Sequence, residues 1–175
     1  GIFGFQAGAG ALTAAVTNNI IDYAGTQRAI AFQGGQEIGV GSALNATITG
    51  NTIDVKLDGT NDAAAGMVVQ GTLVDNGTAA NSPTTAICAD IGGAGALRNT
   101  FTHSLGGAPI IGGDIRVRQR FWSTWRLPGY GGAAADTAAV VSYLAGRNTV
   151  VTAPTASVFS TGFAGGAACT APVIP

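Results

Sequence analysis

The chain has 175 residues, of which 28 are glycine and 10% are charged, and its formal net charge is −1. An average soluble domain carries about 25% charged residues, so this chain either packs its surface extensively or belongs to a larger assembly. The balanced charge excludes a general attraction to nucleic acid or to an anionic membrane. The glycines follow no triplet period, which excludes collagen. The apolar runs are well below the roughly 20 residues that span a bilayer, so we expect no membrane insertion.

The β pattern begins at Val16. Residues 1–15 form an N-terminal segment in which the alternation at Ile2, Phe3 and Phe5 is too short to decide between a first strand, a sheet edge and a piece that packs on another chain. Residues 16–21 are rich in β-branched side chains and predict a strand, which a turn over residues 22–25 ends. A second short strand is predicted over residues 29–33.

The next strands follow the same order. Residues 46–57 alternate with a period of two, as a half-buried strand does. Residues 66–71 then repeat the Gln-Gly ending of residues 29–34, and residues 85–91 predict a further strand. The order of elements therefore repeats along the chain.

The clearest alternation runs over residues 114–122. It places basic and aromatic side chains on one face and mainly apolar side chains on the other. The first face holds Arg116, Arg118, Arg120 and Trp122, and the second holds Ile115, Val117, Gln119 and Phe121. Residues 125–132, which include Trp125 and Arg126, are expected to form a bend.

A single helix is predicted over residues 136–145, where an apolar stripe follows the possible N-caps Asp136 and Thr137. Gly146 stands where a left-handed C-terminal residue belongs. The β pattern resumes at Asn148 and leads into a C-terminal tail.

An Asn-x-apolar unit recurs through the chain. The recurring asparagines are Asn19, Asn51, Asn99 and Asn148, separated by steps of 32, 48 and 49 residues. An apolar residue recurs at a fixed distance after two of these asparagines. Met67 lies 16 residues after Asn51, and Ile115 lies 16 residues after Asn99.

Agreement at two points favours successive coils stacked on one another, because one coil alone cannot bury its apolar side chains. Equivalent residues in such a stack lie about 4.8 Å apart, so each Asn amide can hydrogen-bond to the Asn above and below it. The matching apolar ladder would consist of Ile21, Ile53, Phe101 and Val150. The alternative is a β-sandwich in which the Asn units are unrelated turns.

The Asn-x-Ile units, the string Thr-Ile-Thr-Gly-Asn-Thr-Ile at residues 47–53 and the glycine-rich connections resemble right-handed parallel β-helix proteins. These include pectate-lyase-like enzymes, phage tailspikes and large repetitive bacterial surface or secreted proteins. The resemblance covers residues 16–122, with an echo over residues 147–163.

The resemblance implies an all-β fold, a right-handed parallel β-helix or β-solenoid with one short helix near residues 136–145. Residues 1–175 would form a single domain or a fragment, with coils over residues 16–163 and a tail over residues 164–175. The uneven coil lengths resemble the C-terminal end of such a β-helix.

Cys88 and Cys169 lie far apart, without a CxxC motif or neighbouring histidines, so we expect no metal site. Two cysteines in a chain of this composition predict one disulfide in an oxidising compartment. The alternative is two buried free thiols.

The sequence nominates no catalytic residue and no cofactor. Asp54, Asp58 and Asp62 could offer oxygens to Ca²⁺, but they lack the spacing of a calcium-binding loop. No pair of carboxylates suited to a glycosidase can be chosen. His103 is the single histidine, and spacing indicates no Ser or Asp partner for it.

We predict an interaction face that consists of Arg116, Arg118, Arg120, Trp122, Trp125 and Arg126. Arginines beside tryptophans can hold acidic glycans or phosphates through bidentate hydrogen bonds and stacking. The alternative is structural, since such side chains also pair with acidic loops or pack under a helix.

These observations favour an extracellular structural or interaction protein, the end portion of a bacterial surface or secreted β-helix that acts as an adhesin, stalk or assembly unit. Its expected partners are glycans or other protein chains, including copies of itself. The alternatives are a pectate-lyase-like enzyme active on polysaccharides and a fragment of a phage fibre or tailspike.

Overall fold

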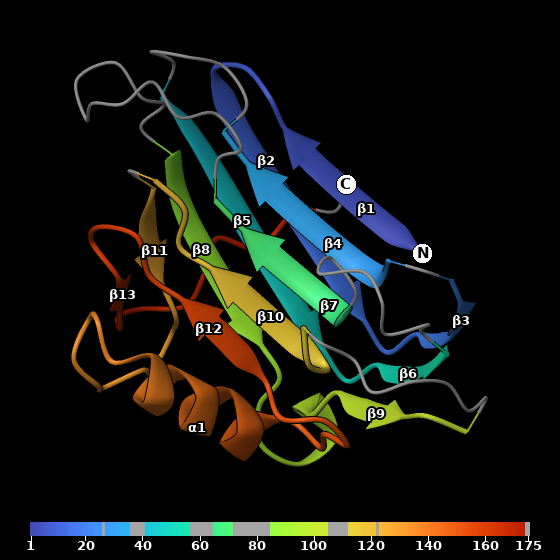
Figure 1. Ribbon diagram of the computed structural model, residues 1–175. Coiled ribbons are helices and arrows are strands. Elements are labelled where there is room, and N and C mark those ends of the chain that lie inside the picture. Colours follow the sequence, from blue (N-terminus) through green and yellow to red (C-terminus); the bar gives the residue numbers. More distant parts are fainter. Residues whose placement is uncertain are drawn as a thin grey trace.

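The computed structural model describes most of the chain, namely residues 1–25, 27–35, 41–56, 65–71, 85–104, 112–121 and 123–173. Within these residues it has thirteen strands, a short 3-10 helix at Gly95–Leu97 and one α-helix (Figure 1). The predicted all-β class with one helix is therefore confirmed in this coarse form.

The strands form three sheets, and all of their pairings are parallel. The first sheet consists of β1 (Ile2–Gln6), β4 (Arg28–Gly34), β7 (Ala65–Gln70), β10 (Ile115–Arg118) and β12 (Thr155–Ser157). The second consists of β2 (Gly10–Thr17), β5 (Ser42–Thr49), β8 (Thr85–Ile91), β11 (Thr124–Arg126) and β13 (Phe163–Ala164). The third consists of β3 (Ile20–Ala24), β6 (Thr52–Lys56) and β9 (Thr100–Thr102).

The chain visits the three sheets in a fixed order. Strands β1, β2 and β3 enter the first, second and third sheets, and β4, β5 and β6 then repeat the order, as do β7, β8 and β9. We call each such passage a circuit. In the fourth circuit an isolated bridge from Thr149 to Thr100 stands where the third sheet would continue. Each circuit thus lies beside the preceding one.

Apolar side chains at equivalent positions of successive circuits fill one shared core. In the first sheet Ile30 pairs in register with Met67, which pairs with Ile115, and all three are fully buried. This pairing is the 16-residue agreement seen in the sequence. In the third sheet Ile53 pairs with Phe101, and both are buried. Burial of these columns is the main stabilising contribution to the fold.

The recurring asparagines form a hydrogen-bonded stack at the corner that leads into the third sheet, and we call this stack the Asn ladder. Asn19 Nδ2 donates to Asn51 Oδ1 at 3.0 Å, and Asn51 Nδ2 donates to Asn99 Oδ1 at 2.8 Å. Asn99 Nδ2 donates to Asn148 Oδ1 at 2.9 Å. Each accepting oxygen also receives the backbone N–H of the donating Asn. The structure thus has the amide stacking that the sequence predicts at these positions.

A left-handed residue makes this corner possible. Asn18, Gly50 and Gly92 have φ angles of 58°, 69° and 69°. A Cβ at Gly50 would clash with the side-chain oxygen of Asn18 and approach the Ala96 carbonyl oxygen to 3.0 Å. Glycine is therefore required between two stacked circuits, whereas Asn tolerates the left-handed conformation at Asn18.

Helix α1 (Thr137–Arg147) covers the end of the molecule where β12 lies, along the bottom of Figure 1. The Asp136 carboxylate caps it by accepting the N–H of Ala139 at 2.9 Å, as predicted. Val140 and Leu144 are the buried residues of its apolar face.

The predicted helix end at Gly146 is wrong. The helix continues through Gly146 to Arg147 and is followed by Asn148, the last member of the Asn ladder. Asn148 Nδ2 donates to the Leu144 carbonyl at 2.8 Å, so the ladder amide satisfies a carbonyl of the last turn. Arg147 then anchors the helix end through its ion pair with Asp90 at 2.5 Å.

Of the alternatives for residues 1–15, the structure has the first strand at a sheet edge, because β1 and most of β2 lie within these residues and pair with β4 and β5. The predicted turn over residues 22–25 is wrong, since Ile20–Ala24 forms β3. The chain turns earlier, at the left-handed Asn18.

The predicted strand over residues 114–122 ends early, at Arg118. The Gln119 side chain is buried and turns the chain, because its Nε2 donates to the Phe121 and Ser123 carbonyls at 2.9 and 2.8 Å. Its Oε1 accepts the N–H of Phe159 at 2.7 Å. Phe121 takes a left-handed φ of 48°, so the alternation of faces does not extend beyond β10. The predicted bend over residues 125–132 likewise begins as a strand, β11.

The Asn99→Ala substitution tests the ladder. Asn99 donates to the Ile48 carbonyl at 2.8 Å as well as to Asn148, and it accepts two bonds from Asn51. Its loss leaves several buried groups without partners, each worth about 1–3 kcal/mol. We expect the free energy of unfolding, measured by urea denaturation, to fall by about 3 kcal/mol. Asn19→Ala, at the end of the ladder, should lower it by only about 1 kcal/mol; equal losses would contradict this reasoning.

Candidate functional site

The predicted interaction face is divided in the structure. Arg116 and Arg118 lie on β10 of the first sheet, and Arg120 lies in the turn that follows. Arg126 lies on β11 of the second sheet. Trp122 lies outside the described residues. The six residues therefore do not share one face, because the strand that was expected to present them ends at Arg118.

Trp125 belongs to the core. It is only 3% exposed and pairs in register with Ile87 and Phe163. Its ring meets that of Phe163 edge-on, with the centroids 5.2 Å apart. The tryptophan thus continues the apolar column of the second sheet, which is a correction to its predicted role as an exposed stacking platform.

A basic cluster remains on the first sheet. Burial, followed by the neighbouring Arg116, lowers the pKa of the Arg28 guanidinium, and the same two causes lower the pKa of Arg120. Arg120 also lies over the Phe121 ring, 5.3 Å from its centroid. Three arginines from β4, β10 and the following turn are therefore close enough to repel one another.

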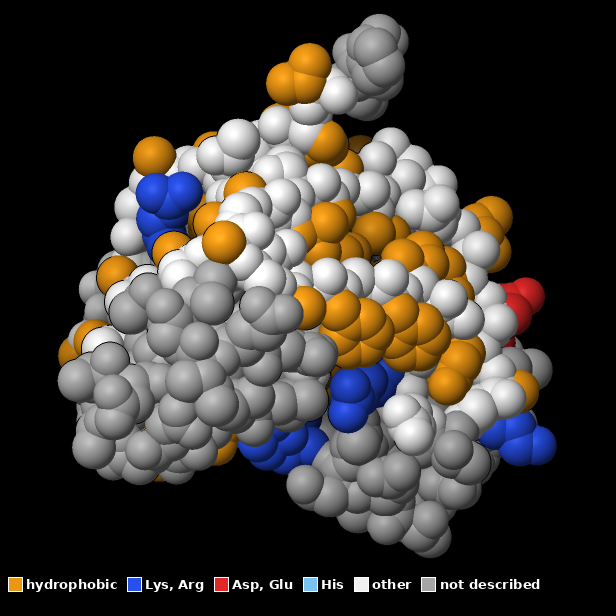
Figure 2. Space-filling view, turned by 90° about the horizontal axis from the view of Figure 1, so that it is seen from above, with side chains coloured by type: hydrophobic (Ala, Val, Ile, Leu, Met, Phe, Trp, Pro, Cys, Tyr) orange, Lys and Arg blue, Asp and Glu red, His pale blue; other side chains and the backbone are white. Residues whose placement is uncertain are grey.

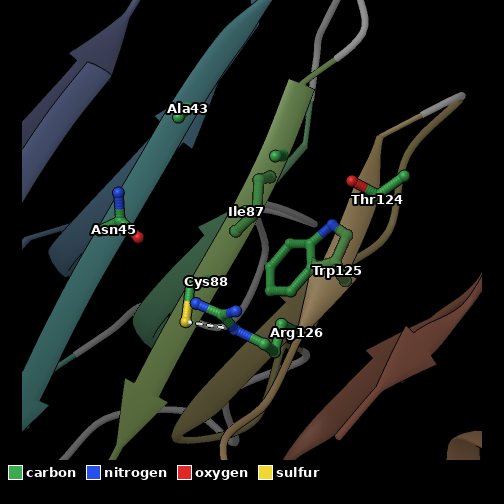
Figure 3. Close-up of a pocket in the computed structure, with 8 residues that line it drawn as sticks. Ala43, Asn45, Ile87, Cys88, Thr124, Trp125 and Arg126 are labelled. Carbon is green, nitrogen blue, oxygen red and sulfur yellow. Dashed lines mark hydrogen bonds between the residues drawn. The ribbon is translucent and has the colours of Figure 1, made fainter. Parts of the chain in front are cut away.

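A groove of about 250 Å³ lies on the outer side of the second sheet (Figure 3). Strands β5, β8 and β11 contribute its walls from equivalent positions in three circuits. It is lined by Ala43, Asn45, Ala86, Ile87, Cys88, Thr124, Trp125 and Arg126. Successive side chains of a strand point to opposite faces, so the alanines and Asn45 face outward between core residues such as Leu44. The small side chains leave the floor of the groove open.

The predicted disulfide is present, and it lies at this groove. Cys88 on β8 is bonded to Cys169, with the two Cα atoms 5.5 Å apart. Arg126 Nε donates to Cys88 Sγ at 3.3 Å, and its Nη2 donates to the Ala168 carbonyl at 3.4 Å. The disulfide therefore holds the C-terminal tail beside the Arg126 guanidinium. Figure 3 shows the Arg126 side chain reaching Cys88.

Two polar side chains of the groove, Arg126 and Asn45, can form further hydrogen bonds. Within the described residues, no carboxylate pairs with Arg126 and no hydrogen bond engages the Asn45 amide. The indole N–H of Trp125 also lacks a partner among the described residues, but this side chain faces the core and not the groove. The groove is thus suited to a ligand rich in oxygen acceptors.

His103 has a partner that spacing does not reveal. Its Nε2 lies 2.7 Å from Oδ1 of Asp114, which is fully buried. The other oxygen, Asp114 Oδ2, accepts the N–H groups of Val151 at 2.6 Å and Thr152 at 2.9 Å. The carboxylate joins three segments of the chain, so its evident role is structural.

Ser104 lies next to His103 in sequence but binds a different carboxylate. Its hydroxyl donates to Asp54 Oδ2 and its backbone N–H donates to Asp54 Oδ1 at 2.9 Å. A Ser-His-Asp device needs the serine hydroxyl on the histidine, and here the two side chains are committed to Asp54 and Asp114. These hydrogen bonds, led by that of the Ser104 hydroxyl, hold the pKa of Asp54 below its ordinary value.

The sequence predicts no calcium-binding loop at Asp54, Asp58 and Asp62. Of these, Asp58 and Asp62 lie outside the described residues. In the part of the chain that the structure describes, no group of three or more His, Cys, Asp and Glu side chains could hold a metal ion. No helix among the described segments has the length and hydropathy to cross a membrane.

Asn45 and Asp114 are the site residues that sequence reasoning missed. Alternation with Leu44 and Ala46 places Asn45 on the outer face, but it cannot place it beside Cys88 and Arg126. Asn45 pairs with Cys88, 43 residues later, and Cys88 pairs with Arg126, 38 residues later. The connections between these strands differ in length, so the sequence alone does not reveal the pairings.

Comparison of the chain with protein-family models, curated proteins and solved structures gave no match.

The Ser104→Ala substitution should raise the pKa of Asp54 towards its ordinary value of about 3.9, because the largest cause of its lowering is removed. A depressed folded-state pKa stabilises the fold above the unfolded-state pKa, and this contribution is lost as pH falls through the folded-state pKa. The variant should therefore lose less stability in acid than the parent does. An NMR titration of the Asp54 carboxyl carbon measures the shift. Thr102→Val, which removes a weaker hydrogen bond to Asp54, should raise the pKa less.

Proposed function

We propose that this chain is the end portion of a right-handed parallel β-helix. The support is the fixed order in which successive circuits add one parallel strand to each of the sheets. Apolar columns and the Asn ladder recur at equivalent positions, as stacked coils require. The right-handed sense follows the rule for crossovers between parallel strands. Helix α1, which covers β12, suits an end of the helix rather than its middle.

The proposed role is that of an extracellular structural and interaction protein, such as an adhesin, stalk or assembly unit. The disulfide between Cys88 and Cys169 supports an oxidising compartment. The stack also supplies long, regular outer faces on which side chains from distant parts of the sequence meet, as Asn45, Cys88 and Arg126 do.

The interaction site that we propose is the groove on the second sheet, and its ligand is an acidic glycan. The observation that carries this proposal is Arg126, a guanidinium that lines the groove without a carboxylate partner among the described residues. A guanidinium binds a uronate carboxylate through strong charge-assisted hydrogen bonds. Asn45 offers both a donor and an acceptor to sugar hydroxyls.

Binding is better supported than hydrolysis at this groove. A glycoside hydrolase places carboxyl groups on both sides of the scissile bond. The residues that line the groove include neither Asp nor Glu. Asp54 and Asp114, the carboxylates with the most hydrogen bonds, are engaged by Ser104 and His103 instead.

Arg126→Ala should weaken the binding of a uronic-acid oligosaccharide such as an oligogalacturonate by about tenfold to a hundredfold, since a hydrogen bond to a charged group is worth about 1.5–3 kcal/mol. Isothermal titration calorimetry measures the affinity. The exposed Lys56 on β6 provides a control that also removes one positive charge, and Lys56→Ala should leave binding unchanged. Equal losses in both variants, or equal binding of a neutral oligosaccharide, would show that only net charge matters.

The extracellular assignment predicts the oxidation state of the native protein. Protein recovered from its source under conditions that trap thiols should show no labelling at Cys88 or Cys169, since a disulfide joins them. Mass spectrometry of the alkylated protein measures this. Stoichiometric labelling of both cysteines would contradict the assignment to an oxidising compartment.

A further inference from the structure

Three edge strands lie together at one end of the molecule. Strands β1, β2 and β3 are the outermost strands of their sheets, with 5, 8 and 5 residues. No described strand pairs with their outer sides, and such an edge is a template for another strand. Together they form one continuous surface, which we call the open end.

Among the described residues, the open end lacks the features that normally protect sheet edges. Proteins blunt such edges with charged side chains, proline, bulges or a covering helix. Strands β1 and β2 contain neither a charged residue nor proline, and β3 contains the single charge of Asp22. Phe3, Phe5 and Ile20 are 50%, 52% and 83% exposed there. Figure 2 shows hydrophobic side chains gathered in rows on the side where β1 and β2 lie in Figure 1.

The core of the first circuit is incompletely covered. Ile2, Leu12 and Ile21 are partly buried, although they belong to the core columns. Their partners one circuit further on are fully buried. These partners are Ile30, Leu44 and Ile53. One more circuit in register would give the first circuit the same environment.

The opposite end is closed. Strands β12 and β13 have only three and two residues, and α1 packs against β12. At this end the donors of the last ladder residue are already used. Asn148 Nδ2 donates to the Leu144 carbonyl, and its backbone N–H donates to the Ala145 carbonyl at 3.4 Å.

The Asn ladder has a direction, and it determines what fits the open end. Every ladder amide donates towards the closed end and accepts from the open end. Asn19 Oδ1 is the first acceptor in this series, and no hydrogen bond from the described residues reaches it. The equivalent atom of the next circuit, Asn51 Oδ1, receives both an amide N–H and a backbone N–H.

We infer that the open end binds a further parallel β-helix coil that carries an Asn at its corner. Such a coil would donate its Asn Nδ2 and backbone N–H to Asn19 Oδ1, pair with β1, β2 and β3, and cover Ile2, Leu12 and Ile21. The inference deepens the proposed function and rests on its architectural part, not on glycan binding.

A second copy of this chain does not meet these requirements. Two copies joined through their open ends would bring two Asn19 acceptors together without a donor. A copy joined by its closed end would present α1 and an Asn148 whose donors are occupied. The matching partner is therefore a coil that is not covered by a helix.

The test adds such a coil to the full chain. Residue 2 pairs with residue 30, so a tandem copy of residues 1–28 placed before Gly1 supplies one coil in register, with its own Asn19 as the donor. Hydrogen exchange should slow at least tenfold at the original β1, β2 and β3 amides, and the urea midpoint should rise. An extension with Asn19→Ala in the copy should give less protection, and one with the copied residues in scrambled order should give none.

The same probe can be used without a fused chain. A synthetic peptide of residues 1–28 added to the parent protein should slow exchange at β1, β2 and β3, and the Asn19→Ala peptide should do so less. The inference is overturned if neither the extension nor the peptide protects these strands, or if the scrambled extension protects them equally. It is also overturned if the parent sediments as a dimer that already protects them. Lack of exchange protection in β5 and β8 of the parent would instead refute the β-helix proposal itself.

Discussion

The structure depends on keeping equivalent residues of successive circuits in register, and the buried Asn ladder is the interaction that enforces it. A slip of one residue would send every core side chain to the opposite face of its strand. It would also separate Asn51 from Asn99, leaving polar groups of two buried side chains without partners. A slip of two residues would keep the core side chains on their face, and apolar contacts alone discriminate weakly against it, because one aliphatic residue packs much like another. The directional amide bonds supply the discrimination that the core lacks.

Register held at the corner lets the rest of the chain vary. The ladder residues are 32, 48 and 49 positions apart, yet the strands before and after the first three corners remain paired in register. Loop closure becomes only slowly more unfavourable with length, so long connections are compatible with the stack. They also bring distant segments together on an outer face. Arg126, Cys88 and Asn45 meet in the groove for this reason, and the disulfide fixes the tail beside them.

Features that repeat could be predicted from the sequence, whereas features that occur once could not. The ladder asparagines and the pairing of Met67 with Ile115 follow from spacing, because a similar residue recurs at the equivalent position of another circuit. The strand after Asp114 was overextended because alternation cannot show that Gln119 is bonded to the backbone at Phe159 and Ser160, about 40 residues later. Trp125 was placed on the surface for the same reason, since only its pairing with Ile87 reveals that it continues the core. The partnership of His103 with Asp114 also required the fold.

The direction of the ladder makes the two ends of the molecule chemically different. An Asn amide that donates and accepts along one axis leaves an acceptor at one end and donors at the other. At the closed end the donors of Asn148 are satisfied by carbonyls of the last turn of α1, so the helix ends the stack through hydrogen bonding as well as by covering it. The open end has the acceptor of Asn19 at its corner, the exposed Phe3 and Phe5 on β1, the exposed Ile20 on β3, and three edge strands. On this proposal a stack of coils that contains this chain continues only from its open end, and α1 closes the other end.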